Sequence, residues 1–379
     1  MTHTGTVQAN GTWQVTYSSG EVGVLADGTN YTVSANVTDI EGNAASANRN
    51  VTVDTSAPGI PSTPDLALAS DSGTFNDDNL TNVTTPTFTG TADAGTTVTI
   101  YSDGVAVGSG VATGGNYSIA VSTLSAGTHS ITAKATDTAG NISNASSTLS
   151  VTIDTSADEG TAATLTVGDA LVSNAEKTAV TYTVTSLDAD ATAIVTVTDG
   201  VHSAQHTFSA DGSFAFNLTG FNDGTVSSSM TITDIAGNST LVTGQNTTLD
   251  TVAAASISID AITADNVVNA SEASGTVAVT GAVGGDVADS DTITLTVNGN
   301  DYTGTSSGGS FSINVAGSDL AADSNVHASV TAHDAAANSA TANDDQSYTV
   351  DTTADAGAGL SVSVSDHLIN NSEKGAVAY

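Results

Sequence analysis

The 379-residue sequence contains no cysteine, only four prolines, 4% aromatic residues and four Lys or Arg residues. Because cysteine is absent, no disulfide stabilises the fold, and folding needs no particular redox compartment. No apolar run approaches the length of a membrane-spanning helix. The first residues lack a basic stretch followed by an apolar one, so they do not predict a secretory signal peptide.

The scarcity of basic residues leaves the chain strongly acidic. Four Lys and Arg residues stand against 40 Asp and Glu residues, which gives a formal net charge of −36 at pH 7. A surface of this charge is a poor partner for nucleic acid and for anionic membranes. Only six of the 40 acids are Glu. Because Asp favours turns and oxygen-donor loops, we expect the acids in loops rather than in helices.

Two short motifs recur along the chain at nearly constant spacing. The first is Asp-x-x-Gly-Asn, with Ala in place of Gly in the last copy, and its copies begin at Asp39, Asp137, Asp234 and Asp334, in steps of 98, 97 and 100 residues. Each copy follows an alternating polar and apolar run, which predicts a tight turn after a strand. The second motif, Asp-Thr, follows each turn after 15 to 17 residues, at Asp54, Asp154, Asp250 and Asp351. Two motifs in fixed order at this period predict one domain type repeated in tandem.

The motifs divide the chain into three whole repeats and two partial ones. The first, second and third whole repeats span residues 56–155, 156–251 and 252–352. Residues 1–55 align with the C-terminal half of a repeat and residues 353–379 with the start of another, which predicts a fragment of a longer protein. The boundaries between these five segments, in chain order, are called the first to fourth junctions.

The first whole repeat shows seven short segments in which polar and apolar residues alternate, separated by Gly, Asn or Asp turns. This pattern predicts an all-β chain of immunoglobulin-like, seven-stranded β-sandwich domains arranged as an elongated rod. Thr, Val, Ser and Gly dominate these segments, which disfavours helices. The predicted strands lie near 65–70, 84–92, 96–102, 105–112, 116–123, 129–136 and 145–153.

An acidic segment separates the first two predicted strands of each repeat, and we call it the A–B segment. It runs from Asp169 to Glu176 and from Asp265 to Glu272, and recurs from Asp366 to Glu373. The first whole repeat keeps the seven-residue step with different chemistry, from Asp71 to Asp78. In a seven-stranded sandwich the first loop and the end of the last strand share one pole, while the second and sixth loops share the other. Each A–B segment is therefore predicted to face the next repeat.

Strand parity predicts that acids of one repeat meet acids of the next at every junction. The linker residues Asp158 and Asp355 are expected to add to two of these sites. The predicted residues are Asp54, Asp93 and Asp137 at the first junction; Asp71, Asp77, Asp78, Asp154, Asp188, Asp190 and Asp234 at the second; Asp169, Glu176, Asp250, Asp286, Asp289, Asp291 and Asp334 at the third; and Asp265, Glu272 and Asp351 towards the fourth.

Converging carboxylates repel one another unless a cation lies among them. At an effective dielectric constant near 20, two unit charges about 4 Å apart cost roughly 4 kcal/mol. Oxygen donors in flexible loops, without His or Cys, favour Ca²⁺ over zinc or copper. The alternative is that these Asp residues only form turns or protect strand edges. Their repetition at successive junctions favours Ca²⁺ as the cofactor.

Several motifs together carry a resemblance to a known family. They are Asp54-Thr55-Ser56-Ala57-Pro58, Asp71-Ser72-Gly73, Thr85-Pro86-Thr87-Phe88-Thr89-Gly90 and the Asp-x-x-Gly-Asn turns. With these motifs the chain resembles the bacterial immunoglobulin-like repeats of giant calcium-dependent adhesins. The resemblance implies a non-catalytic extender on the bacterial cell surface, with Ca²⁺ at the linkers, type I secretion, and roles in attachment and biofilm formation. It also implies neighbouring repeats as partners, with any surface or glycan ligand bound by domains outside this chain.

Two other classes of function fit the sequence less well. No Gly-x-Ser-x-Gly, phosphate-binding loop or paired-His metal motif supports an enzyme, and His202 and His206 lie among strand residues. Asp188 and Asp190 resemble a glycosidase pair, but such chemistry needs a cleft with aromatic walls. The remaining alternative is a carbohydrate-, surface- or ice-binding module, since Thr-rich strands such as residues 96–99 present a flat polar face.

Overall fold

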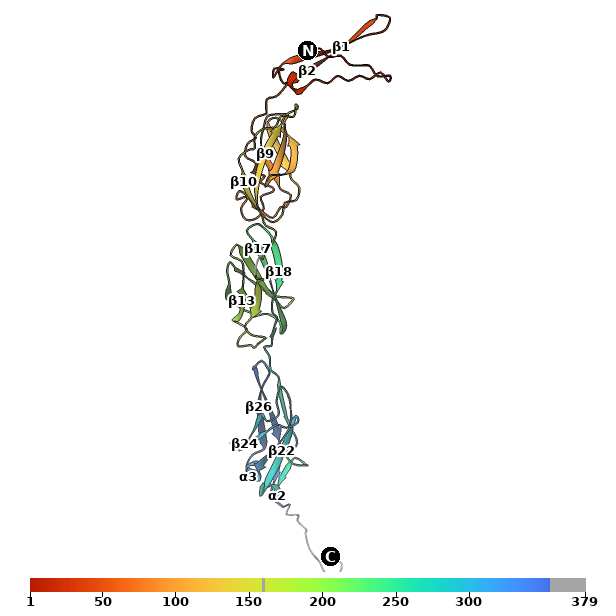
Figure 1. The fold of residues 1–379 in the computed structure, drawn as a ribbon. Coiled ribbons are helices and arrows are strands. Elements are labelled where there is room, and N and C mark those ends of the chain that lie inside the picture. Colours follow the sequence, from red (N-terminus) through yellow and green to blue (C-terminus); the bar gives the residue numbers. More distant parts are fainter. Residues whose placement is uncertain (159–160, 355–379) are drawn as a thin grey trace, which may run out of the picture.

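The structure is a computed structural model that describes residues 1–158 and 161–354. Three β-rich units follow one another along an elongated rod, and residues 1–55 lie at one end of it (Figure 1). The longest helix in the described residues has 6 residues, so no described helix is long enough to cross a bilayer. Asp355 and the acidic segment from Asp366 to Glu373 lie outside the described residues.

Residues 1–55 form strands and one helical turn but bury no side chain. β1 (Asn30–Thr38) and β2 (Ala44–Thr52) pair antiparallel along their whole length, and α1 (Ser19–Val22) is a single turn. None of these 55 residues is buried. Trp13 is 54% exposed and Ile40 97% exposed. This segment therefore lacks the two-sheet packing that the three whole repeats show.

The first whole repeat packs two sheets face to face. One sheet has the strand order β3-β5-β8 and the other β4-β10-β9-β6-β7. Alternate residues of both sheets meet in a core that contains Phe88, Val98 and Ile131, as the period-two pattern predicts. The strands are β3 (Asp65–Leu66), β4 (Leu80–Thr81), β5 (Thr87–Thr91), β6 (Thr97–Ser102), β7 (Val105–Val111), β8 (Asn116–Ala120), β9 (Gly127–Thr136) and β10 (Leu149–Ile153).

The second whole repeat has the same two layers. Its sheets have the orders β11-β13-β16 and β12-β19-β17-β14-β15, and β18 also pairs with β17. Tyr182 and Phe216 meet edge to face in the core, beside Met230. The strands are β11 (Thr164–Val167), β12 (Leu171–Val172), β13 (Val180–Thr185), β14 (Ala191–Thr198), β15 (Ser203–Phe208), β16 (Gly212–Phe216), β17 (Gly224–Asp234), β18 (Ser239–Thr243) and β19 (Thr247–Leu249).

The third whole repeat differs by two short helices. Its sheets have the orders β20-β22-β25 and β24-β23-β26-β27, with β21 paired to β28. Ile293, Leu295 and Phe311 lie in its core. The elements are β20 (Ala255–Ile259), β21 (Val267–Asn269), α2 (Ala270–Ala273), β22 (Thr276–Gly285), β23 (Thr292–Val297), β24 (Asn300–Thr305), β25 (Ser310–Ala316), α3 (Gly317–Ala322), β26 (Asn325–His333), β27 (Ser339–Ser347) and β28 (Thr349–Asp351).

The first strand of each whole repeat is split, which the sequence pattern did not predict. The strand predicted at 65–70 ends at Leu66, because the N–H groups of Ser70 and Asp71 turn back to the Ala67 carbonyl. The second piece then crosses to the other sheet and pairs parallel with the last strand, as β4 with β10, β12 with β19, and β21 with β28. The A–B segment therefore ends beside the last strand, at the pole that faces the next repeat.

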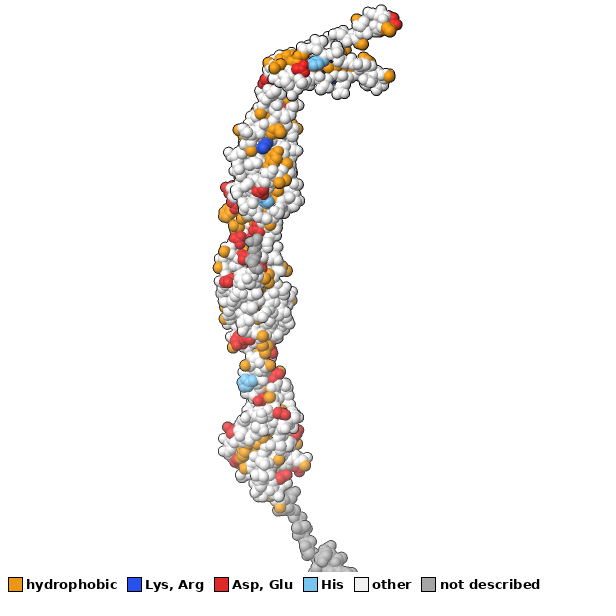
Figure 2. Space-filling view, in the orientation of Figure 1, with side chains coloured by type: hydrophobic (Ala, Val, Ile, Leu, Met, Phe, Trp, Pro, Cys, Tyr) orange, Lys and Arg blue, Asp and Glu red, His pale blue; other side chains and the backbone are white. Residues whose placement is uncertain are grey.

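Acidic side chains mark this pole in the space-filling view. Red side chains gather at both ends of the middle unit, where one repeat meets the next (Figure 2). The sides of the rod are mostly uncharged in the same view. In this view, acidic side chains of neighbouring repeats therefore lie near each other at the junctions.

Candidate functional site

The Asp-x-x-Gly-Asn turn is built around its leading carboxylate. Asp137 Oδ1 accepts hydrogen bonds from the N–H groups of Ala139, Gly140 and Asn141 at 2.8 to 2.9 Å. Asn141 Nδ2 donates to the other carboxylate oxygen, Oδ2, at 2.9 Å. The Asn141 amide and these N–H groups hold the pKa of Asp137 below its ordinary value. Asp and Asn therefore recur because each closes the turn through the other.

The same asparagine also reaches the preceding segment at three junctions. In each case its Nδ2 donates to the main-chain carbonyl of the Asp that follows the last strand of that segment by one or two residues. The pairs are Asn141 with Asp54 (3.1 Å), Asn238 with Asp154 (3.1 Å) and Asn338 with Asp250 (2.8 Å). The two recurring motifs of the sequence thus meet at each of these junctions.

The aspartates of the Asp-Thr motif each begin the linker with a local turn. Their Oδ1 atoms accept a hydrogen bond from the N–H two residues later. The pairs are Asp54 with Ser56, Asp154 with Ser156, Asp250 with Val252 and Asp351 with Thr353. One oxygen of each carboxylate therefore accepts a hydrogen bond that holds the first residues of the linker in a turn.

At the second junction the A–B segment docks directly onto the turn of the next repeat. Ser72 Oγ donates to the Ala236 carbonyl at 2.9 Å, and the Thr74 N–H donates to the Ile235 carbonyl at 3.0 Å. Between them Gly73 adopts a φ of 102°, and a Cβ there would lie 2.1 Å from the Ile235 carbonyl oxygen. Only glycine permits this approach.

Asp71 lies buried next to this contact. It is 6% exposed, its Oδ2 accepts a hydrogen bond from the Asn79 N–H, and its Oδ1 has no hydrogen-bond partner within the described residues. Burial raises the pKa of Asp71, and repulsion from Asp78 and Asp77 adds to that rise. A buried carboxylate oxygen without a donor is costly, so this group suits a cation or a proton.

The third junction uses a different contact. The Asn174 N–H donates to Asn338 Oδ1 at 2.8 Å, which again places an A–B segment against the next turn. The predicted ligands of this segment are engaged locally. Glu176 accepts hydrogen bonds from the Ser173 N–H and hydroxyl, and Asp169 accepts one from the Leu171 N–H. The Ser173 bonds hold the pKa of Glu176 below its ordinary value.

The predicted acids of the loops between the second and third sandwich strands also bind main-chain groups. Asp93 accepts from the Gly59 N–H at 2.7 Å, and Asp286 from the Ala254 N–H at 2.7 Å, so each holds the linker that enters its own repeat. Asp188 and Asp190 lie in the turn before β14, where the Ala191 N–H bonds to the Asp188 carbonyl. The remaining pairs are Asp289 with Gly308 and Asp291 with Ala288.

The acids predicted towards the fourth junction lie at the far pole of the third repeat. Asp265 accepts a hydrogen bond from the Val267 N–H, which lowers its pKa together with the Thr263 hydroxyl. Glu272 accepts one from the Asn269 N–H and closes the first turn of α2. Asp351 ends β28. Their counterparts beyond residue 354 lie outside the described residues.

The junctions were tested for their fit to Ca²⁺. Across residues 1–158 and 161–354, no three His, Cys, Asp or Glu side chains lie close enough together to hold a metal ion by themselves. Calcium also takes main-chain carbonyls, amide oxygens and water among its 6–8 oxygen ligands. Within the described residues, two buried carboxylate oxygens near the second junction, Asp71 Oδ1 and Asp158 Oδ1, have no hydrogen-bond partner. Each suits a cation, but these carboxylates do not form a closed site, so a bound Ca²⁺ would need main-chain carbonyls, amide oxygens or water as its other ligands.

The linker of the second junction leaves room beside Asp158. A polar hollow of about 420 Å³ lies between the linker and the following turn. It is lined by Thr155, Ser156, Ala157, Asp158, Asn238, Ser239, Thr240 and Val242. Hydroxyl, carboxylate and amide oxygens predominate there, as a hydrated hard cation requires.

Comparison with known proteins places this architecture in a family. Residues 58–155 match the bacterial Ig-like domain family. The chain is 30% identical to a Ca²⁺-stabilised adhesin that helps an Antarctic bacterium reach out and bind ice, over 91% of this chain and 86% of that one, with a TM-score of 0.47. It is 33% identical, over 79% of this chain and 100% of the other, to a 1.5-MDa bacterial ice-binding adhesin studied for host cell surface retention (TM-score 0.44). The chain belongs to the bacterial Ig-like adhesin repeats.

A single Ig-like domain of the M. primoryensis ice-binding adhesin is 50% identical to these adhesin repeats, over 26% of this chain and 100% of that one, with a TM-score of 0.26. Because the TM-scores lie below 0.5, the assignment rests on sequence identity and on the family match. No curated protein matches the chain. Ig-like adhesin repeats are typically non-catalytic structural modules, and both related proteins are bacterial adhesins.

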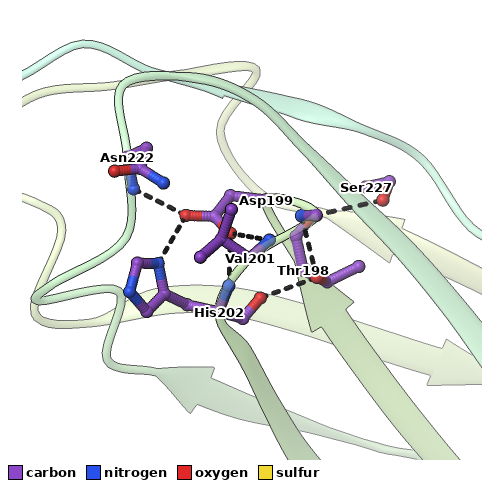
Figure 3. A network of polar contacts seen from close by, with 7 residues as sticks. Thr198, Asp199, Val201, His202, Asn222 and Ser227 are labelled. Carbon is purple, nitrogen blue, oxygen red and sulfur yellow. Dashed lines mark hydrogen bonds and ion pairs between the residues drawn. The ribbon is translucent and has the colours of Figure 1, made fainter.

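The adhesin repeats also contain a polar network away from the recurring motifs. In Figure 3 Asp199, in the turn after β14, accepts hydrogen bonds from the N–H groups of Val201, His202 and Asn222 and from the His202 ring. Burial alone would raise the pKa of Asp199, but the Asn222 N–H and the other donors outweigh it and lower that pKa. His202, considered above as a metal ligand, holds this turn through Nδ1.

Sequence reasoning missed two sets of junction residues. One is the turn asparagine, although it recurs at the fifth position of all four motif copies, which was an available signal. The other is Ser72, Gly73 and Thr74, whose partners lie more than 160 residues away and leave no local pattern.

Proposed function

We propose that the chain is a non-catalytic extender segment of a bacterial cell-surface adhesin, in which Ca²⁺ at the junctions holds successive repeats in line. The observation that carries this proposal is the contact between the two recurring motifs, made with the same atoms at three junctions. An enzyme or a lone binding module has no need for such a repeated connection. A stalk needs it, because its length depends on the angle at every junction.

Charge explains why a cation would be needed as well. The formal net charge of −36 makes neighbouring repeats repel each other, and the acids at the strand ends lie where two repeats meet. At the second junction Asp71 is the proposed carboxylate ligand of Ca²⁺, joined by at most one of Asp154 and Asp158, and neighbouring carbonyl, amide and water oxygens would complete the site. At the third junction the strand-end residue Asp250 and the turn residue Asp334 remain the proposed carboxylate ligands. Bound Ca²⁺ would neutralise these carboxylates and oppose bending.

Affinity and cellular role follow from the same proposal. Extracellular calcium modules have dissociation constants on the order of 10⁻⁴ to 10⁻³ M. Exposure on the cell surface places the stalk where calcium reaches such concentrations. Export by type I secretion and support of cell attachment and biofilm formation belong to the proposal, because the related chains are adhesins.

Thermal unfolding of the full chain tests the calcium part of the proposal. A ligand that binds only the folded form at about 100 times its dissociation constant stabilises it by about 2.7 kcal/mol. We expect Ca²⁺ at about 10 mM to raise the midpoints of the whole repeats by several degrees relative to excess chelator. An equal concentration of Mg²⁺, which accepts only near-octahedral sites, is expected to do less. Equal midpoints in Ca²⁺ and chelator would contradict the proposal.

A further inference from the structure

We infer that the asparagine of each junction turn (Asn141, Asn238 and Asn338) is a metal-independent latch that fixes one segment on the preceding one. This turn-asparagine latch rests on the proposed extender function. The asparagine is then a positioning residue that needs no metal. Two separate interactions hold successive segments in line, namely this hydrogen bond and the bound cation.

The geometry of the latch is the same at all three junctions. A side-chain amide has two N–H hydrogens and one oxygen. One hydrogen bonds to the Asp Oδ2 of the same turn at 2.8 to 2.9 Å. The other bonds to the carbonyl of Asp54, Asp154 or Asp250 at 2.8 to 3.1 Å. Both hydrogens are therefore bonded to oxygen acceptors. If the amide were flipped, its own oxygen would face these acceptors, so the flipped orientation is excluded.

At the second and third junctions the latch connects two rigid parts. At the second junction the carbonyl belongs to Asp154, whose own N–H is bonded to the Thr81 carbonyl at the end of β4. At the third junction the Asp250 N–H is bonded to the Val172 carbonyl in the same way. On the other side the asparagine is fixed in its turn by its N–H bond to Asp234 or Asp334. The bond therefore links the sheet of one repeat to the turn of the next without the flexible linker.

Burial protects the latch from water. Asn338 is 8% exposed, and Asn141 and Asn238 are half-buried. In this environment the loss of the amide would leave a carbonyl and a carboxylate oxygen without a donor. A net hydrogen bond of this kind shifts an equilibrium by roughly tenfold, and unsatisfied partners add to that shift. The open form of a junction should therefore become about tenfold more populated when the latch is removed.

The four copies of the motif show which position the latch requires. The turn glycine is replaced by Ala337 in the last copy, where the residue keeps a φ of 66°. The asparagine is present in all four copies. Aspartate has the same shape but places a carboxylate against two oxygen acceptors. The turn thus tolerates the loss of its glycine but keeps its asparagine, which bonds within the turn in every copy and also reaches the preceding segment at three junctions.

The test measures the second junction in the full chain without calcium. Because the chain has no cysteine, nitroxide labels can be attached to cysteines introduced at the exposed positions Val105 and Leu241, one in each adjoining repeat. Electron–electron distance measurements in excess chelator report the width of the label–label distribution. We expect the distribution of Asn238→Ala to be broader than that of the parent chain under the same conditions.

Two controls isolate the contact. Asn338→Ala makes the same change at the third junction and should leave the distribution at the second unchanged. Asp234→Asn alters the bond inside the turn but leaves the Asn238 amide facing the Asp154 carbonyl, and should broaden the distribution less. If Asn238→Ala unfolds the second repeat, as circular dichroism would show, Asn238→Asp replaces it, because this isosteric variant keeps the shape of the side chain while it exchanges the donor for a carboxylate.

The outcomes separate the latch from the calcium proposal. Distributions in chelator that are no broader in both Asn238 variants than in the parent chain overturn the latch. If that happens and Ca²⁺ still narrows the parent distribution, the calcium proposal stands without the latch. If the variants broaden the distribution and Ca²⁺ changes nothing, the latch stands and the calcium proposal fails.

Discussion

The second and third junctions join repeats of one family, yet they are built differently. Both use the turn asparagine, but the second adds main-chain docking of Ser72 and Thr74 onto the next turn. The third replaces this with a single hydrogen bond from the Asn174 N–H. The second also buries a carboxylate oxygen that has no donor among the described residues. Repeats that share a fold therefore need not share a junction.

One turn position accounts for much of this difference. At the second junction the turn carries Gly237, and a Cβ there would lie 3.1 Å from Gly73 Cα and 3.2 Å from Gly73 N. At the third junction the equivalent residue is Ala337, which has that Cβ. The same close approach of an A–B segment would there require a shift of a few tenths of an ångström. Contact between repeats is set by pairs of small residues, one on each side of the junction.

The largest expected effect comes from Gly73→Ala. Its Cβ would lie 2.1 Å from the Ile235 carbonyl oxygen, so the A–B segment must leave the next turn. Hydrogen exchange at the Thr74 N–H, which donates to that carbonyl, measures the change and should lose its protection. Gly104→Ala is the matched control, because Gly104 also has a positive φ of 82° but nothing within 4 Å of its Cβ position. Both variants pay about 1–2 kcal/mol for the left-handed backbone, so protection of Thr74 that is equal in the two would refute the docking.

Asp71→Asn tests the buried carboxylate through its pH dependence. Because the folded-state pKa of Asp71 is raised, its protonation stabilises the fold as the pH falls, and that stability is lost as the pH rises through the folded pKa. In chelator the first repeat should therefore gain stability from Asp71 as the pH is lowered from 7 towards its raised pKa. The variant should lose this gain and be more stable than the parent at pH 7 in chelator, but less stable in Ca²⁺.

Chemical denaturation at several pH values, with and without Ca²⁺, measures both effects. The expected difference at pH 7 is about 1–3 kcal/mol, the cost of one unsatisfied buried polar group. Carboxylates with lowered pKa values, such as Asp137, act in the opposite sense and lose their contribution only below their ordinary pKa. If the free energy of unfolding depended on pH in the same way in the parent and in Asp71→Asn, Asp71 would not be the cause of that pH dependence.

A smaller effect is expected from Gly237→Ala, which gives the second junction the residue found at the third. The neighbour distance of 3.1 Å requires a shift of a few tenths of an ångström, so the junction should loosen without opening. Gly140→Ala is the matched control, because it occupies the same turn position with a φ of 97° and nothing within 4 Å. Hydrogen exchange at Thr74 should rise for Gly237→Ala alone. A rise of the same size in Gly140→Ala would assign the effect to turn strain instead.

Local sequence patterns were sufficient to predict the β-sandwich and the loops that lie at each of its two ends. The alternation of β6 and β9 predicts strands, and Asp with Asn predicts the turns, because these signals arise from neighbours in the chain. The crossing of β4 to the second sheet left no such signal, since it depends on pairing with β10, about 70 residues later. Glu176 was predicted to bind Ca²⁺, but the Ser173 hydroxyl of the same loop donates a hydrogen bond to its carboxylate. Which acids bind Ca²⁺ stays a prediction, since metal geometry depends on both sides of a junction.

Small-angle X-ray scattering of the full chain tests the central claim, that calcium at the junctions keeps the rod straight. The maximum dimension should be larger in Ca²⁺ than in excess chelator, because several junctions bend independently once their carboxylates repel each other. Return of Ca²⁺ should restore the larger value. An unchanged maximum dimension, at calcium concentrations above 10⁻³ M where such sites are filled, would contradict the account.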